Sequence, residues 1–318
     1  MVIYVIKEGD DIMEIIKMSN KKFNELEPLS LSNNVYNTEA ELYFYQDKNK
    51  WQNEKKVLKK LFLDEGNIFS NKLYTINSLI DNRSVINMEE LAIPEKLAVV
   101  SSKVVGYTMP YVEGTNLADV IFDKNVSHKE KIEYFKQVGE ILEKIKNIRK
   151  HTDIDDFYLN DLHESNLIIN KETNKINIVD MDSCRINGNK PFATRYLSGQ
   201  GLRKLPNKYH VNEDNKYLGY IIANEDTDLY CYNIMVLNYL FKGSVNRLTE
   251  EEFYTYLQYL ERIGIPNELV YCFSKLYLYM DNVNIKDYLD MIDETSMYLA
   301  NKKVFENYHN KKIYYKSR

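Results

Sequence analysis

Three polar residues between positions 161 and 180 have the types and the spacing needed to handle a metal-bound phosphate. Asp161 and Asn166 lie in one short loop, and Asp180 follows the next apolar stretch of the chain. A carboxylate and an amide oxygen suit a hard, octahedral cation such as Mg²⁺, which takes few protein ligands and completes its shell with water and phosphate. The chemistry that this set could support is binding or transfer of a phosphate group.

The sequence between these residues predicts a β-hairpin that brings them together. Residues 167–170 and 175–179 are rich in β-forming side chains, and the turn-forming sequence Lys-Glu-Thr-Asn separates them. If the turn centres near Thr173, the residue that faces Asn166 across the ladder is Val179 or Asp180. We therefore expect Asn166 and Asp180 at one end of the hairpin, with Asp161 pointing into the same region.

The loop DLHESN, which begins at Asp161, resembles the D-x-x-x-x-N catalytic loop of the protein kinase superfamily, and Asp180-Met181-Asp182 resembles its D-F-G motif. The resemblance implies that Asp161 accepts the proton of an attacking hydroxyl and that Asn166 holds one Mg²⁺. It also implies that Asp180 bridges the metal ions to the phosphates of ATP.

The loop departs from the protein-kinase form in four positions. Leu159 and Asn160 replace the usual His and Arg, His163 replaces a Lys, and Asp182 replaces the Gly of D-F-G. The motif D-L-H-x-x-N is more similar to the corresponding motif of bacterial kinase-like proteins and small-molecule kinases. A hydroxyl on a small metabolite therefore remains an alternative acceptor to a protein hydroxyl.

The sequence before residue 103 does not show the other kinase motifs. Residues 34–46 predict a turn and a strand, and Phe44 stands where the resemblance expects the strand lysine. Lys48, Lys50 or a lysine of the next predicted helix are the alternatives, and the sequence does not choose among them. No glycine occurs between Gly9 and Gly66, so the sequence does not contain a recognisable Gly-rich phosphate loop in this region.

Residues 51–63 predict an amphipathic helix. This helix would carry Glu54 as the partner of a strand lysine, with an ordinary surface charge as the alternative role of Glu54. The sequence further predicts a short amphipathic helix at 10–18, a helix at 70–80 and a strand at 91–100.

The stretch KVVGYTMPYVEGTNL, residues 103–117, predicts a strand, a break and the start of a helix, and it resembles the kinase hinge. The resemblance implies that the backbone of Met109, Tyr111 and Val112 receives the adenine edge of ATP. Pro110 has no N–H, so Tyr111 or Val112 would be the donor. An ordinary connection between strand and helix is the alternative.

The rest of the chain predicts a helical lobe. A capping box of Ser127 and Glu130 opens an apolar-striped helix over 127–150. A buried helix follows Asp228, which by the resemblance hydrogen-bonds the backbone of the catalytic loop. Residues 186–223 are irregular. Further helices are predicted at 249–262, 267–280 and 285–300, and the basic tail 301–318 shows no periodicity.

Composition limits the classes of function. The 318 residues are 44% hydrophobic and 28% charged, which is enough for one large or two modest globular lobes. A net charge of -5 argues against a nucleic-acid binder. The cysteines, Cys184, Cys231 and Cys272, form no C-x-x-C pair, so a reducing cytoplasm is expected. No segment is apolar enough for a membrane span.

These observations lead to one expected architecture and three candidate functions. The fold class is α+β, as a two-lobed protein-kinase-like fold with an N-terminal extension (1–33), a small β-rich N-lobe (34–112), a larger helical C-lobe (113–300) and a basic tail (301–318). The leading function is ATP- and Mg²⁺-dependent phosphoryl transfer to a hydroxyl, with a protein as the favoured acceptor. The alternatives are a pseudokinase that binds nucleotide or protein without turnover, and a small-molecule kinase.

Overall fold

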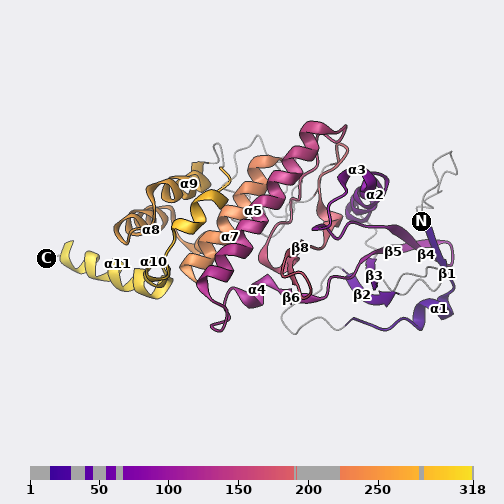
Figure 1. Ribbon diagram of the computed structural model, residues 1–318, viewed down its shortest axis with the longest axis horizontal. Coiled ribbons are helices and arrows are strands. Elements are labelled where there is room, and N and C mark those ends of the chain that lie inside the picture. The colour runs from indigo at the N-terminus through magenta and orange to yellow at the C-terminus, as the bar shows by residue number, and fades with distance from the viewer. Residues whose placement is uncertain are drawn as a thin grey trace. The chain divides into compact units, whose positions relative to one another are not determined.

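The computed structural model describes residues 15–29, 40–45, 55–61, 67–189, 191, 223–278 and 283–316. The chain divides into two compact units. One comprises Met1–Asn87 and Ala92–Tyr111, and the other comprises Met88–Leu91 and Val112–Arg318. The first unit is rich in sheet and the second is mainly helical, which confirms the α+β class (Figure 1). The break between Tyr111 and Val112 lies one residue before the expected boundary.

The sheet of the first unit has the strand order β1-β4-β5-β3-β2. Neighbouring strands are antiparallel except β1 and β4, which are parallel. β3 is paired on both edges, so it is an interior strand. The strands are β1 (Ile15–Met18), β2 (Ala40–Tyr45), β3 (Lys56–Leu61), β4 (Lys96–Val100) and β5 (Lys103–Pro110).

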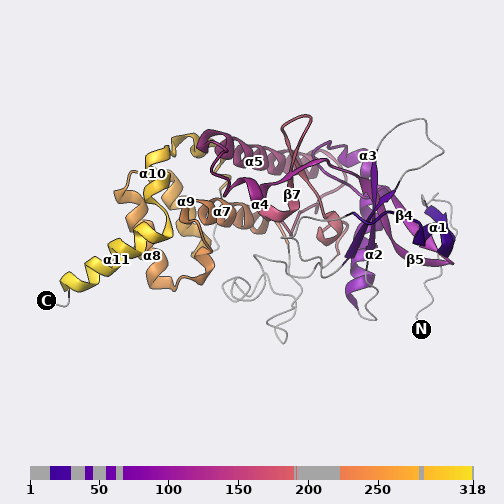
Figure 2. The same cartoon turned by 90° about the horizontal axis from the view of Figure 1, so that it is seen from below.

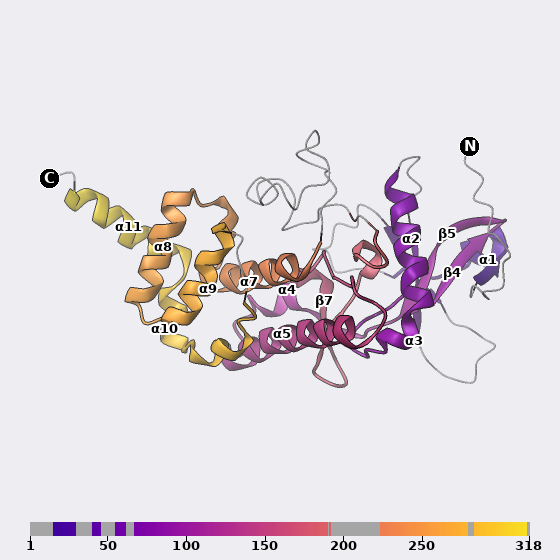
Figure 3. The same cartoon turned by 90° about the horizontal axis from the view of Figure 1, so that it is seen from above.

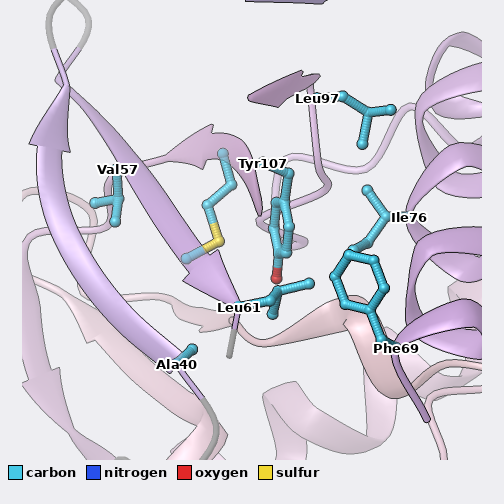
Figure 4. Close-up of a cluster of buried hydrophobic side chains, with 8 residues drawn as sticks. Ala40, Val57, Leu61, Phe69, Ile76, Leu97 and Tyr107 are labelled. Carbon is cyan, nitrogen blue, oxygen red and sulfur yellow. The ribbon is translucent and has the colours of Figure 1, made fainter. Parts of the chain in front are cut away.

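Helix α2 (Asn67–Asp81), which confirms the helix predicted at 70–80, covers one face of this sheet (Figure 3). Phe69 and Ile76 of the helix meet Val57 and Leu61 of β3 in a buried cluster with Tyr107 of β5 (Figure 4). Each such side chain contributes about 1.5–3 kcal/mol of transfer free energy when fully buried. This cluster therefore fixes how β3 and α2 lie against one another. The short helix α3 (Arg83–Ile86) follows.

The other face of the sheet is covered by the N-terminal segment. Met18 of β1 is buried with Leu58 and Ala98, and Phe23 of helix α1 (Asn20–Asn24) packs against the same cluster. The described part of the expected extension thus belongs to the N-terminal unit. The predicted helix at 10–18 is wrong over Ile15–Met18, which is a strand because it pairs with β4. Residues 10–14 lie outside the described residues.

The helix predicted over 51–63 is also wrong, because the described part of it forms strand β3. Val57, Leu58 and Leu61 fit an apolar helical face, and Lys and Leu are good helix formers. The same spacing also places Val57 and Leu61 on one face of a strand and Leu58 on the other. Pairing to two neighbouring strands decides the outcome. Glu54 lies outside the described residues.

A second, three-stranded sheet lies in the helical unit with the order β6-β7-β8. β6 (Gly114–Asn116) leads into the short helix α4 (Leu117–Val120), which the side chain of Asn116 caps. β7 (Leu167–Asn170) and β8 (Ile176–Ile178) form the predicted hairpin. Ile178 also donates its backbone N–H to the carbonyl oxygen of Glu90 at 2.7 Å, which ties residues 88–91 to this unit.

Two long helices form the core of the second unit. α5 (His128–His151) and α7 (Glu225–Phe241) lie side by side (Figure 1), and Tyr232 of α7 donates a hydrogen bond to the carbonyl oxygen of Phe135 at 2.7 Å. The capping box at Ser127 and Glu130 is confirmed. α7 is buried on nearly all sides, as expected for a central helix.

The C-terminal helices follow the prediction at 249–262 and 267–280 and depart from it beyond residue 283 (Figure 2). The single helix predicted at 285–300 is wrong, because Asp293 caps a new helix in its middle. The tail beyond residue 301 is helical, and Phe305 is buried against Phe241 and Tyr256. The elements are η4 (Val245–Arg247), α8 (Glu250–Arg262), α9 (Asn267–Leu278), η5 (Lys286–Met291), α10 (Glu294–Leu299) and α11 (Lys302–Lys316).

Candidate functional site

Asp161 and Asn166 are in direct contact. The Nδ2 group of Asn166 donates to the backbone carbonyl oxygen of Asp161 at 3.0 Å and to its carboxylate Oδ2 at 3.1 Å. Residues 164–166 form the 3₁₀ turn η1, which places Asn166 at the start of β7 with 8% of its surface exposed. The five-residue spacing therefore closes the loop onto itself and sets the direction of the Asp161 carboxylate.

Asp180 lies at the same end of the hairpin, as predicted. Val179 faces Asn166 and donates its backbone N–H to the carbonyl oxygen of Asn166 at 2.9 Å, and Asp180 is the next residue. Asp180 has φ 64° and ψ 53°, in the left-handed region, and opens the 3₁₀ turn η2 (Met181–Ser183). Few non-glycine residues adopt this conformation, and those that do cluster at functional sites.

The loop that contains Asp161 and Asn166 is anchored to α7 by a buried carboxylate. Asp228, in the first turn of α7, accepts the backbone N–H of Leu159 at 2.9 Å and that of Asn160 at 2.9 Å. Asp228 is 3% exposed. Burial raises the pKa of its carboxyl to about 6, although the hydrogen bonds from both backbone N–H groups act to lower this pKa. The supporting role that the sequence suggests for Asp228 is present in the geometry.

Three further contacts fix the two ends of the loop. Tyr158 and Arg185 exchange backbone hydrogen bonds at 2.9 Å in each direction. Asn160, at φ 60°, donates from Nδ2 to the carbonyl oxygen of Ser183 at 3.0 Å. Asn116 donates from Nδ2 to the carbonyl oxygen of Ser165 at 2.6 Å. The loop is therefore held by β6, by the segment after η2 and by α7.

The donor set at this site fits Mg²⁺ better than a metal that prefers nitrogen or sulfur. Asn166 uses its Nδ2 group to bond Asp161, and the amide oxygen of an asparagine is a ligand that Mg²⁺ accepts. Asp180 supplies a carboxylate. No cluster of three or more His, Cys, Asp or Glu side chains able to hold a metal occurs among the described residues. Mg²⁺, which keeps several waters and takes phosphate oxygens, does not require such a cluster.

The residues proposed to receive adenine do not all have free backbone donors. The N–H of Tyr111 donates to the carbonyl oxygen of Lys55 at 3.0 Å, which extends the pairing of β5 with β3. The side chain of Met109 is buried in the cluster under α2. The sequence leaves the backbone N–H groups of Tyr111 and Val112 as the two candidate donors to adenine. The hydrogen bond to Lys55 engages Tyr111, so Val112 is the better candidate.

Strand β3 carries a buried lysine that the sequence analysis did not single out among the lysines of residues 51–63. Lys59 is 4% exposed and lies between Val57 and Leu61 on the face that α2 covers, with Nζ 6.0 Å from the ring centroid of Tyr107. Burying a lysine is costly unless its charge is compensated. The sequence Val-Leu-Lys at this position resembles the strand motif V-A-I-K. It was not identified as a strand because residues 51–63 were predicted to form a helix.

The backbone approaches Lys59 closely. A Cβ atom at Gly106 of β5 would lie 1.9 Å from the carbonyl oxygen of Lys59, so only glycine permits the two strands to come together here. Helix α2, the described helix that follows β3, contains no glutamate. Among the described residues of this unit, Glu95 is a buried carboxylate, and it pairs with Lys56 and Arg83.

No protein-family model matches the chain, and no curated protein sequence matches it. None of the helices in the described part of the chain is long and apolar enough to cross a bilayer. The kinase resemblance therefore rests on the residues and the geometry given above.

Proposed function

We propose that the chain has a two-lobed protein-kinase-like fold and transfers the γ-phosphoryl group of ATP to a hydroxyl, with Mg²⁺. The observation that carries this proposal is the joined pair Asp161 and Asn166, with Asp180 at the same end of the hairpin. Asp161 and Asn166 belong to a loop whose backbone is tied to the buried carboxylate of Asp228. Folding alone does not require the polar side chains of Asp161, Asn166 and Asp180 to lie together, so their arrangement favours a functional role.

The order of elements in the first unit supports the same proposal. A strand with a buried lysine, a helix, and two further strands precede Tyr111. In protein kinases the lysine of the third strand contacts the α- and β-phosphates of ATP. Lys59 on β3 is our candidate for that role, so the phenylalanine at position 44 no longer argues against catalysis.

Each residue of the site has a distinct proposed task. Asp161 orients the acceptor hydroxyl and takes its proton while the hydroxyl oxygen attacks the γ-phosphorus. The bond from that phosphorus to the β–γ bridging oxygen breaks, and ADP leaves with the electron pair. Asn166 and Asp180 would hold Mg²⁺, which neutralises phosphate charge. A protein is the favoured acceptor, a small metabolite is the alternative, and the cytoplasm is the proposed location.

A pseudokinase is the second candidate, and one observation favours it. The sequence has no glycine between Gly9 and Gly66 for a phosphate loop. A protein of this kind would bind nucleotide or a protein partner without turnover. Transfer of labelled γ-phosphate to itself, a lysate or a panel of small hydroxyl compounds separates the two candidates.

Nucleotide binding should depend on Mg²⁺, because Asp180 and the Oδ1 of Asn166 are acceptors and would otherwise face the triphosphate without a cation between them. We expect ATP with Mg²⁺ to raise the melting temperature and ATP alone to do so much less. A ligand at about 100 times its Kd adds about 2.7 kcal/mol of stability, or roughly 5–10 °C at about 2–4 °C per kcal/mol. Equal shifts with and without the metal would contradict the assignment of Asn166 and Asp180.

Lys59→Met should weaken MgATP binding by about tenfold or more, since a buried cation that contacts phosphate oxygens makes charge-assisted hydrogen bonds. Lys60→Met is the matched control. Lys60 lies on the opposite face of the same strand and pairs with Glu41 at 2.7 Å near the surface. Titration calorimetry with MgATP measures both variants. Equal affinities for the two would remove Lys59 from the nucleotide site.

A further inference from the structure

We propose that His163 is a positioning residue that holds the carboxylate of Asp161, an inference that rests on the proposed function. His163 lies two residues after Asp161 in the same loop, and its Nε2 is 3.6 Å from Oδ1 of Asp161. The two side chains are 12% and 18% exposed, so both are largely shielded from water.

The other ring nitrogen determines which form of the imidazole is present. The backbone N–H of Ser165 donates to Nδ1 of His163 at 3.2 Å, where the side chain caps the turn η1. Because Nδ1 accepts a hydrogen bond, the hydrogen of the neutral ring must be on Nε2. The donor of the ring therefore faces Asp161, and the backbone of the same loop holds it in that orientation.

The carboxylate of Asp161 thus has a donor beside each oxygen. Asn166 donates to Oδ2 at 3.1 Å, and Nε2 of His163 lies beside Oδ1. The second distance, 3.6 Å, is longer than a hydrogen bond, and catalytic hydrogen bonds commonly shorten when the substrates bind. Together the two donors restrict rotation of the carboxylate, so that one lone pair keeps its direction toward the acceptor hydroxyl.

Two substitutions separate the two contacts of the ring. His163→Asn keeps an acceptor near the position of Nδ1 for the N–H of Ser165 but cannot reach Asp161. His163→Gln can place an N–H group near the position of Nε2 but loses the acceptor for Ser165. We expect His163→Asn to lower kcat by about tenfold or more, with KM for MgATP and the melting temperature little changed. His163→Gln should restore kcat to within about threefold of the wild type.

The kinetic outcomes decide the proposal. Unchanged kcat in His163→Asn would overturn it. Equal losses of kcat in both variants would overturn it as well, because the effect would then follow the shape of the ring or its bond to Ser165. A parallel fall in melting temperature and kcat would assign His163 a purely structural role.

A measurement without turnover tests the contact itself. The chain has five histidines, and comparison of nitrogen-15 spectra of the wild type and His163→Asn identifies the imidazole of His163. We expect the tautomer with hydrogen on Nε2, and the opposite tautomer would overturn the proposal. Absence of turnover in the wild type would instead contradict the proposed function, while the tautomer would still support or overturn the contact with Asp161.

Discussion

Replacing Asp161 by Asn is expected to abolish phosphoryl transfer while leaving MgATP affinity nearly unchanged. The amide has almost the same shape as the carboxylate but cannot take the proton of the acceptor hydroxyl, and general-base groups contribute about 10²–10⁴-fold to rate. Asp161 is also held by Asn166 rather than placed as a metal ligand. Its loss should therefore appear in kcat and not in nucleotide binding.

The test compares Asp161→Asn with two matched variants. Asp180→Asn should weaken both MgATP binding and transfer, because it removes a negative ligand from the ion that neutralises the phosphates. Asp155→Asn makes the same chemical change at an exposed position before the loop and should change neither. Transfer of labelled γ-phosphate and calorimetric binding of MgATP are measured on the same samples. Full transfer by Asp161→Asn would exclude Asp161 as the base.

The parts of the site that could be predicted from sequence are those fixed by local geometry. The hairpin followed from two short apolar runs and a turn between them, and it placed Asp180 beside Asn166 without knowledge of any other element. The five-residue spacing from Asp161 to Asn166 likewise closes within one loop. The anchoring by Asp228 was predictable only through the resemblance, because residues 159 and 228 are far apart in the chain.

The sequence reasoning failed where pairing with distant strands decides the structure. Lys56–Leu61 has helix-forming residues and an apolar spacing that fits either a helix or a strand. This segment forms a strand because β2 and β5 pair with it on its two edges. The same pairing engages the N–H of Tyr111 with Lys55, so this donor could not be judged from the hinge sequence alone. Lys59 was not singled out for the same reason.

The error at the C-terminal end has a different cause. A continuous helix over 285–300 satisfies the apolar pattern, but Asp293 accepts the backbone N–H of Ser296 at 2.6 Å and starts a new helix there. An aspartate inside a predicted helix competes for backbone donors, and this competition favours an N-cap. The buried position of Phe305 then follows from contacts with α7 and α8 that no local pattern reveals.

The largest effect on stability is expected from Asp228→Ala. The substitution leaves the N–H groups of Leu159 and Asn160 buried without their acceptor, at a cost of about 1–3 kcal/mol for each unsatisfied group. We expect the melting temperature to fall by roughly 5 °C or more at about 2–4 °C per kcal/mol. Asp155→Ala is the control, because it removes a carboxylate at an exposed position before the loop and should change stability by about 0.5 kcal/mol or less.

The cost of Asp228→Ala should also depend on pH, and the sign of that dependence tests the burial of the carboxylate. Burial raises the pKa of Asp228 from 3.8 to about 6 in the folded chain. A raised folded-state pKa contributes stability that is complete below about pH 4 and is lost as pH rises through about 6. The wild type therefore gains stability relative to Asp228→Ala as the pH falls from 7 to 5, by about 1 kcal/mol. Unfolding by urea at both pH values measures the difference. A cost that shrinks toward pH 5 would mean that the hydrogen bonds from Leu159 and Asn160 outweigh burial and hold the pKa of Asp228 below its ordinary value.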